Sequence, residues 1–437
     1  MTYTFSFVCS VTVLCTAVTA HAFTTASSEN EENFHSVSEN LLSQETISLD
    51  TILAYVAIHN PAIQTAQSRL RAAQQIPAQV SAYDDPRVMW DNWNTPENLR
   101  IDQAGNNIFR LSQKIPFPGK LSLQGQIAAK EAEQREAELR ATESDVSAQV
   151  KKAYYDLWLT YQNVQVYRRD TELVAKFAHI AERKYAVGQV SQPDVLRAQV
   201  ELTRLANRVT TETLALQKVR ARLNALLSRP PEAPLGIPQD PPSAVVTYSM
   251  ADLEPLTLKN RPELIAQTKA IEKEQITLAL ARKAYYPDFE FSVSRFVNFR
   301  QHDGFGFVVS ATIPLAFRYK YDARVEEAVA NQQAAQSELR RVQDLALFEV
   351  KQTLVAAQTA LEQLKLFLHT HIPQAEQALA SSQIGYQTGK VDFLSLIDSL
   401  RVVEQVHLEH LMATANFEKA WAELERAVGQ PLPRTYP

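Results

Sequence analysis

The stretch Tyr185–Leu196, YAVGQVSQPDVL, places a glycine and a proline between two segments that otherwise have the composition of long helices. The whole chain has only 10 glycines, so their positions are informative. Gly188 can adopt a positive φ and end a helix, and Pro193 is tolerated in the first turn of the next one. A second copy, Tyr386–Ile397 (YQTGKVDFLSLI), has Gly389 at the same place. We therefore predict two hairpin tips, at each of which a long helix doubles back.

The spacing of 201 residues between the two tips recurs along the chain and indicates a duplicated architecture. Other pairs at this spacing are Pro61 and Pro262, Pro86 and Pro287, Val190 and Val391, Leu223 and Leu424, and Pro230 and Pro431. We predict a first repeat over residues 48–228, a second over 252–431 and a short tail at 432–437. The residues 229–251 between them belong to a run, Arg229 to Pro255, that holds seven of the 21 prolines. We predict a stiff extended strap there and no helix.

The N-terminal residues 1–22 have the features of a secretory signal peptide. They contain no Asp, Glu, Lys or Arg, and an apolar run leads to AHA at 20–22, an A-x-A cleavage pattern. An N-terminal membrane anchor is the alternative, although its apolar span would be short. Both cysteines, Cys9 and Cys15, lie in this segment, so we expect no disulfide and no thiolate metal site in the mature chain. A polar segment, 23–47, follows.

Two segments of the second repeat alternate apolar and polar residues with the period of a β-strand. The segment Asp288–Arg300 reads DFEFSVSRFVNFR, with Arg295 as the one polar member of its apolar side, and Phe305–Ile313 continues the alternation after a turn. A weaker version in the first repeat ends at Phe109–Ile115. Strands of this length cross a bilayer. A soluble sheet with one wet face is the alternative, but an exported chain with hairpins at equivalent places favours the membrane.

Very long helices are predicted between the strands and the tips. From Lys120 to Val187 the chain has no proline, which allows a helix of roughly 100 Å at about 1.5 Å per residue. Its counterpart, Lys320–Thr388, contains Pro373, where we predict a kink. After each tip, residues on a 3,4 spacing are typical of a coiled-coil seam. In the first repeat these are Leu202, Leu205, Val209, Glu212, Leu216, Val219, Leu223 and Leu226.

Two hairpins supply only four strands, and this number restricts the assembly. Lipid does not tolerate an open sheet edge, because each unpaired backbone group costs several kcal/mol. Bacterial barrels begin at about eight strands. We therefore predict that several copies of the chain share one barrel, from which the helices extend as a second cylinder.

The order of these features resembles the TolC-type outer-membrane efflux factors. The residues that carry the resemblance are the two tips, YAVGQVSQPDVLRAQ and YQTGKVDFLSLIDSL, and the strand-to-helix joins SQKIPFPGK (Ser112–Lys120) and SATIPLAF (Ser310–Phe317). The resemblance implies a mainly α fold with a small β part. It further implies a homotrimer with a twelve-stranded β-barrel in the outer membrane, continuous with a periplasmic α-helical tunnel.

The same resemblance implies a function. The family serves as the exit duct of tripartite pumps, with a periplasmic adaptor and an inner-membrane transporter, here of the RND type, as partners. The IPFPGK join is most similar to the branch that serves heavy-metal pumps for cobalt, zinc and cadmium or for copper. The outer-membrane duct of a type I protein-secretion system is an alternative within the same fold. A periplasmic coiled-coil scaffold without a pore is an alternative from another class.

The resemblance also implies which residues close the tunnel. Asp194 matches the family's acidic tip residue, and Tyr386 matches the aromatic residue that bonds to that acid. In the second repeat the family's two constriction acids correspond to Ser395 and Asp398, so one ring of carboxylates is replaced by hydroxyls. The family's basic partner is replaced by Val391. As an alternative, Asp194 beside Pro193 is a charge that favours a helix N-terminus.

Histidines near the second tip suggest a metal site. In an antiparallel hairpin His371 would lie opposite His410, and imidazoles are ligands for zinc and copper. The alternative is that both are solvated or hydrogen-bonded side chains on a water-lined tube. Other chemistry is not indicated: the sequence has no G-x-S-x-G, P-loop or H-E-x-x-H motif, so we expect neither an enzyme nor a cofactor. The net charge of −5 gives no footprint for nucleic acid.

Overall fold

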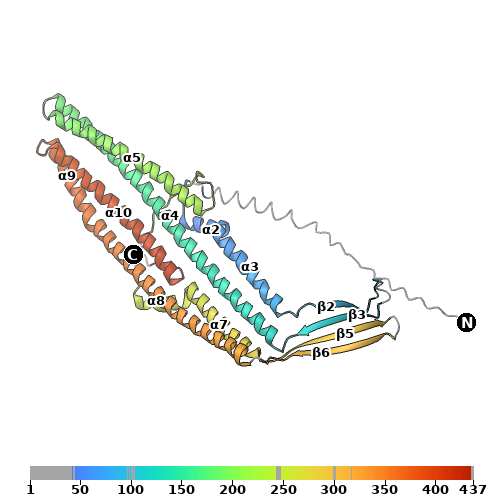
Figure 1. Ribbon diagram of the computed structural model, residues 1–437. Coiled ribbons are helices and arrows are strands. Elements are labelled where there is room, and N and C mark those ends of the chain that lie inside the picture. Colours follow the sequence, from blue (N-terminus) through green and yellow to red (C-terminus); the bar gives the residue numbers. More distant parts are fainter. Residues whose placement is uncertain are drawn as a thin grey trace.

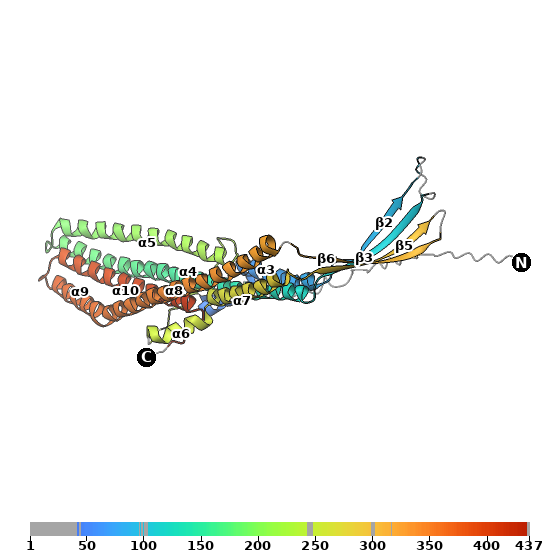
Figure 2. The same ribbon diagram turned by 60° about the horizontal axis from the view of Figure 1, so that its bottom comes forward.

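The computed structural model describes residues 42, 45–95, 97, 99, 104–242, 248–298, 302–315 and 317–434. The molecule is elongated, with a small sheet at one end and helix hairpins that reach away from it (Figures 1 and 2). Within those residues, no helix combines the length and the apolar character needed to span a membrane. The predicted signal peptide, most of the polar segment 23–47, residues 299 and 300, and the end of the tail lie outside the described residues.

Both repeats run through the same elements. The first contains α2 (Leu49–His59), α3 (Pro61–Ser81), β2 (Arg87–Trp93), β3 (Asn106–Ile115), α4 (Lys120–Ala186) and α5 (Gln192–Leu226). The second contains α6 (Met250–Asn260), α7 (Pro262–Lys283), β5 (Asp288–Asn298), β6 (Gly304–Thr312), α8 (Asp322–Leu366), α9 (Ile372–Gln387) and α10 (Phe393–Val428), with π-helical turns η2 (Phe317–Tyr321) and η3 (Phe367–His371). The first residues of α2 and α6, α3 and α7, β2 and β5, and α5 and α10 are each 201 positions apart. The duplicated, mainly α fold is confirmed.

Each repeat begins with a short helix, α2 or α6, that the sequence did not indicate, and the longer helix α3 or α7 follows it. The Asn60 side chain accepts a hydrogen bond from the Ala62 N–H and donates one to the Leu226 carbonyl, so it caps α3 and ties it to the end of α5. α6 begins at Met250, inside the run that we predicted to be extended. That prediction is wrong for its last residues, because Ser249 and Asp252 form a capping box that starts the helix, and Pro255 lies inside α6.

The strap does have a partner. Its strand β4 (Ile237–Pro238) pairs in parallel with β1 (Thr46–Ile47). The Tyr154 hydroxyl of α4 accepts from the Gln239 N–H of the strap at 2.9 Å, and the Trp158 indole N–H donates to Asp240 at 2.8 Å. The strap is therefore held against α4 by hydrogen bonds that involve side chains more than 70 positions away in the sequence.

The four long strands form one antiparallel sheet in the order β2-β3-β5-β6. The register places apolar residues of all four strands on one side, which we call the apolar face: Val88, Trp90, Phe109, Leu111, Phe291, Val293, Phe305, Phe307 and Val309. These side chains are exposed, from 44% for Val293 to 80% for Val88. In the part of the chain that the structure describes, β2 and β6 have no strand on their outer edges.

The helices pack along the predicted seam. Every seam position of α5 is buried or half-buried, and Leu205 and Leu223 are fully buried. α8 and α9 meet at an angle in Figure 2. The π-helical turn η3 joins them, and Pro373 lies directly after it in the first turn of α9. The interruption predicted at this proline is therefore present.

Candidate functional site

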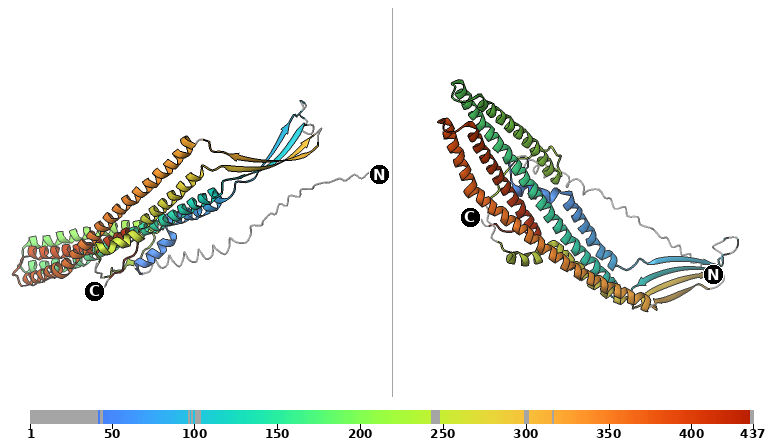
Figure 3. Two further views of the ribbon diagram at one scale, coloured as in Figure 1. Left: turned by 90° about the horizontal axis from the view of Figure 1, so that it is seen from below. Right: turned by 60° about the vertical axis from the view of Figure 1, so that its left-hand side comes forward.

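The two hairpin tips lie side by side at the end of the molecule farthest from the sheet (Figures 1 and 3). The first joins α4 to α5 and the second joins α9 to α10. Gly188 has φ +73° and Gly389 has φ +76°, which is the left-handed conformation that lets a helix end. Pro193 stands in the first turn of α5. A hydrophobic cluster behind the tips contains residues of all four helices, among them Phe177, Ala198, Leu379 and Phe393.

Tyr386 is the buried aromatic residue of the second tip, with 3% of its surface exposed. Its ring packs edge-on against Phe393, with the ring centroids 5.5 Å apart. The Lys184 ammonium of α4 lies 4.7 Å from the centroid of the same ring. It also donates to the main-chain carbonyls of Tyr386 at 2.5 Å and Gln387 at 3.2 Å, at the C-terminus of α9. Lys184 thus joins the two tips in two ways: by a cation–π contact with the Tyr386 ring and by hydrogen bonds that cap the last carbonyls of α9.

Sequence reasoning missed Lys184. A lysine four residues before a tip glycine looks like any basic residue in the last turn of a helix. Its counterpart in the second repeat is Gly385, so the duplication gives no hint of a shared role. Only the folded structure brings it to α9.

The hydrogen bond between Tyr386 and Asp194 that the resemblance implies is not formed. The Tyr386 hydroxyl is buried and has no hydrogen-bond partner among the described residues. Asp194 is engaged within its own helix turn, by the Ser191 hydroxyl at 3.2 Å and the Arg197 guanidinium at 3.5 Å. Burial, and after it the nearby charge of Asp194, raise the pKa of the Tyr386 hydroxyl. In this protomer Asp194 stands in the first turn of α5.

Ser395 and Asp398 belong to α10. Asp392, which the sequence reading overlooked, is the N-cap of this helix and accepts from the Ser395 N–H at 3.0 Å. Hydrogen bonds from Ser395 lower the pKa of the Asp392 carboxyl. Asp398 is exposed and lies 3.6 Å from the Arg401 guanidinium. Its negative charge is therefore partly compensated, as that of Asp194 is by Arg197.

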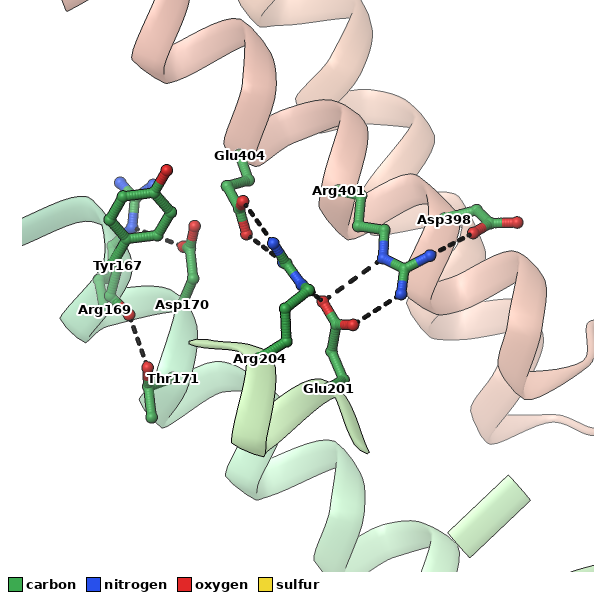
Figure 4. Close-up of polar contacts among 9 residues, drawn as sticks. All are labelled: Tyr167, Arg169, Asp170, Thr171, Glu201, Arg204, Asp398, Arg401 and Glu404. Atoms are coloured by element: carbon green, nitrogen blue, oxygen red, sulfur yellow. Dashed lines mark hydrogen bonds and ion pairs between the residues drawn. The ribbon is translucent and has the colours of Figure 1, made fainter. Parts of the chain in front are cut away.

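Arg401 belongs to a chain of charges that joins α5 to α10 (Figure 4). Arg204 contacts Glu201 at 2.7 Å and Glu404 at 2.8 Å, and Arg401 contacts the second oxygen of Glu201 at 2.7 Å. The Glu201 side chain is 1% exposed. Burial alone would raise the pKa of Glu201, but the guanidinium groups of Arg401 and Arg204 hold it below its ordinary value. These four residues, with Asp398, form what we call the interhelix charge network.

The histidine hypothesis receives no support from the geometry. The His371 ring lies against the edge of Phe367, with centroids 5.3 Å apart. His407 contacts Glu376 at 3.3 Å, and burial, followed by the neighbouring His407, lowers the pKa of His410. Among the described residues, no group of three or more His, Cys, Asp or Glu side chains is arranged to hold a metal ion. A pair formed by His371 and His410 would lack further ligands from the described part of the chain.

The sequence and the fold were compared with known proteins. The family model described as "Outer membrane efflux protein" matches residues 53–229 and 253–430. The cobalt-zinc-cadmium resistance protein CzcC of Cupriavidus metallidurans is 23% identical over 391 residues, which cover 88% of this chain and 90% of CzcC.

Solved structures have the same fold. The outer membrane protein VceC of Vibrio cholerae superposes with a TM-score of 0.71 at 18% identity, covering 87% of this chain and 96% of VceC. CusC gives a TM-score of 0.73 at 16% identity and covers 87% and 92%. The family model spans both repeats, with their paired tips and paired strands. This chain belongs to the outer membrane efflux protein family, whose members are channels and not enzymes.

Proposed function

We propose that three copies of this chain form the outer-membrane exit duct of an efflux pump that exports divalent heavy-metal cations. The observation that supports the assembly most strongly is the four-stranded sheet with an exposed apolar face and two edges free of further strands among the described residues. Such a sheet is unstable in lipid until its edges are paired. Edge-to-edge pairing of β2 with β6 of a neighbouring copy closes a barrel, and three copies supply twelve strands.

The helices then form the periplasmic tunnel, with the tips at its inner end. Members of this family act with an adaptor and an inner-membrane pump. We assign the closed aperture to the two tips, where Asp194, Tyr386, Ser395 and Asp398 lie. Because Asp194 and Asp398 each have an arginine partner, the aperture is a weak cation filter. Specificity therefore comes from the pump beneath the duct.

The cargo is proposed from the CzcC match, which covers most of both chains. The test is deletion of the gene followed by growth with cobalt, zinc, cadmium and copper salts, and separately with detergents and antibiotics. We expect sensitivity to one or more of the metals, restored by the wild-type gene. Unchanged metal tolerance together with sensitivity to organic compounds would contradict the metal cargo. Loss of an exported protein instead would favour a type I secretion duct.

The channel itself is tested separately with purified protein. We expect a trimer that requires detergent and conducts ions when it is added to planar bilayers. A monomer that is stable in plain buffer would contradict both the trimer and the pore.

A further inference from the structure

The apolar face of the sheet carries a groove of about 350 Å³ between neighbouring strands. Its lining includes Leu111 and Gln113 of β3, Phe291 and Val293 of β5, and Phe307 and Val309 of β6. These residues are cross-strand partners in two adjacent rows: Leu111, Val293 and Phe307 in one, and Gln113, Phe291 and Val309 in the other. The groove thus crosses three strands, and Gln113 is the one polar side chain among these six residues. Its largely apolar lining suits a hydrocarbon chain.

The next row along the strands contains a cation. Arg295 lies between Phe109 and Phe305 in the register, on the same face as the groove. Its guanidinium lies 4.7 Å from the centroid of Phe305 and 2.8 Å from the Asp303 carboxylate. The side chain remains 39% exposed. Trp90, whose ring stacks on Phe109 at 6.3 Å, completes an aromatic row around it.

This row lies toward the outer edge of a membrane-embedded sheet. Arg295 is seven residues after Asp288, the first residue of β5, and three before Asn298, its last. With the tilt of about 35–45° that barrel strands have, those seven residues rise roughly 16–19 Å along the barrel axis. The apolar band of bacterial barrels is about 25 Å tall and ends in a girdle of aromatic residues. Arg295 and Trp90 therefore lie in the outer part of this band, from which the long arginine side chain reaches the headgroup level, with the groove on the side toward the bilayer centre.

We propose that the groove and Arg295 together bind one phosphate-bearing lipid of the outer leaflet, with an acyl chain in the groove and its phosphate on the guanidinium. The proposal rests on the proposed function, because only a closed barrel leaves the apolar face toward lipid. A guanidinium has five donors in a planar fork and matches phosphate well. Asp303 occupies part of that fork, so phosphate and Asp303 compete for Arg295. An uncharged headgroup would gain nothing from this site.

The test uses native mass spectrometry of the detergent-solubilised trimer with diphosphorylated lipid A and with the dephosphorylated lipid that carries the same acyl chains. We expect the phosphorylated lipid to bind more tightly than the dephosphorylated one. Arg295→Gln should lower the affinity for the phosphorylated lipid by about threefold to fivefold, which is the contribution of a partly exposed ion pair. Asp303→Asn should raise the affinity, because it removes the competing carboxylate. The opposite signs of these two variants separate a lipid site from general damage to the barrel.

The matched control is Arg110→Gln, on β3 of the same sheet. Arg110 points to the other face, where it donates to the Ser294 hydroxyl at 3.3 Å, and its loss should leave lipid binding unchanged. Phe307→Ala should weaken both lipids, because it shortens the groove wall. Equal binding of the two lipids, or an equal effect of Arg295→Gln and Arg110→Gln, would each overturn the proposal.

Conductance in planar bilayers distinguishes failure of the lipid-site proposal from failure of the proposed function. A wild-type trimer that conducts but shows no preference for the phosphorylated lipid would overturn the lipid site alone. A protein that neither forms a trimer nor conducts would overturn the duct, and the lipid site with it.

Discussion

Tyr185 in the first tip and Tyr386 in the second are equivalent residues of the two repeats, yet Tyr185 is 47% exposed and Tyr386 is 3% exposed. The difference extends around each tyrosine. The first tip also exposes Val187 and Leu196, at 68% and 51%. The second tip is packed on the hydrophobic cluster of its own protomer and is held by Lys184 of the first. The two copies of the hairpin have therefore diverged. The second tip is anchored, and the first is more exposed.

Gly385 and Lys184 explain how the two tips diverged. A Cβ atom at Gly385 would lie 2.5 Å from Cγ2 of Val391, so the second tip closes tightly on itself. The first tip has Lys184 at that position, and its long side chain reaches across to the other hairpin. Both tips expose apolar side chains, Val187 and Leu196 in the first and Ile384 and Leu394 in the second, but only the second buries its tyrosine within the chain.

The largest effect is expected from Arg204→Met, which removes the central cation of the interhelix charge network. Glu201 and Glu404 would then remain buried with only Arg401 to compensate them. We expect a loss of about 2 kcal/mol, less than for a fully buried pair because Arg204 is 32% exposed. The measurement is thermal unfolding of the trimer. Because α5 and α10 are then held together less firmly, we also expect channel conductance to rise.

Arg341→Met is the control for this change. Arg341 pairs with Glu338 of its own helix, and its side chain is 63% exposed. We expect little change in unfolding or conductance. If both variants unfold alike, the network does not hold the two hairpins together.

Gly385→Ala is expected to have the next largest effect, because it forces the second tip open. Contact with Val391 is too close for both side chains, and such overpacking costs about 1–3 kcal/mol, offset by up to about 1 kcal/mol from the better helix propensity of alanine. Conductance should rise as the tip shifts. The double variant Gly385→Ala with Val391→Ala should restore the wild-type behaviour. Without that rescue, the contact is not what anchors the tip.

Lys184→Met tests the bond between the tips directly. The variant loses the hydrogen bonds from Lys184 to the α9 carbonyls and the cation–π contact. We expect this loss to destabilise the second tip by about 1 kcal/mol. More frequent open events in single-channel recordings are the expected readout, and Lys184→Arg should behave like the wild type. Lys390→Met removes an exposed charge from the second tip and serves as the control. Identical recordings for Lys184→Met and Lys390→Met would refute the role of Lys184.

Tyr386→Phe is expected to have the smallest effect. The hydroxyl has no hydrogen-bond partner among the described residues, so removing it should leave stability within about 0.5 kcal/mol of wild type and conductance unchanged. A clear increase in conductance would mean that the hydroxyl bonds to a neighbouring copy in the trimer. The second tip would then be less self-contained than its comparison with the first suggests.

Much of the fold could be predicted because it depends on local rules. Gly188, Gly389 and Pro193 mark the tips through φ restrictions, and the alternation from Asp288 reveals β5 through its period. The constant spacing of 201 residues aligns the repeats. These signals lie within short windows of sequence, or between windows that repeat.

The details of the site could not be predicted, because they depend on side chains that meet only after folding. Lys184 and the α9 carbonyls are about 200 positions apart, as are Arg204 and Glu404. The resemblance implied a bond from Tyr386 to Asp194, yet Arg197 and Ser191 take that carboxylate. None of these contacts produces a periodic pattern or a change of composition that could be recognised in the sequence.

The π-helical turn η3 has a mechanical consequence. α4 is unbroken over 67 residues, whereas the equivalent path is divided at η3, and α9 beyond it has 16 residues. At about 1.5 Å per residue, α9 is a lever arm of roughly 24 Å. A rotation of about 10° at its base would carry the second tip by roughly 4 Å, while the stiff rod beside it stays still. A small rotation at η3 would thus be amplified at the second tip, where it would have to break the contacts with Lys184.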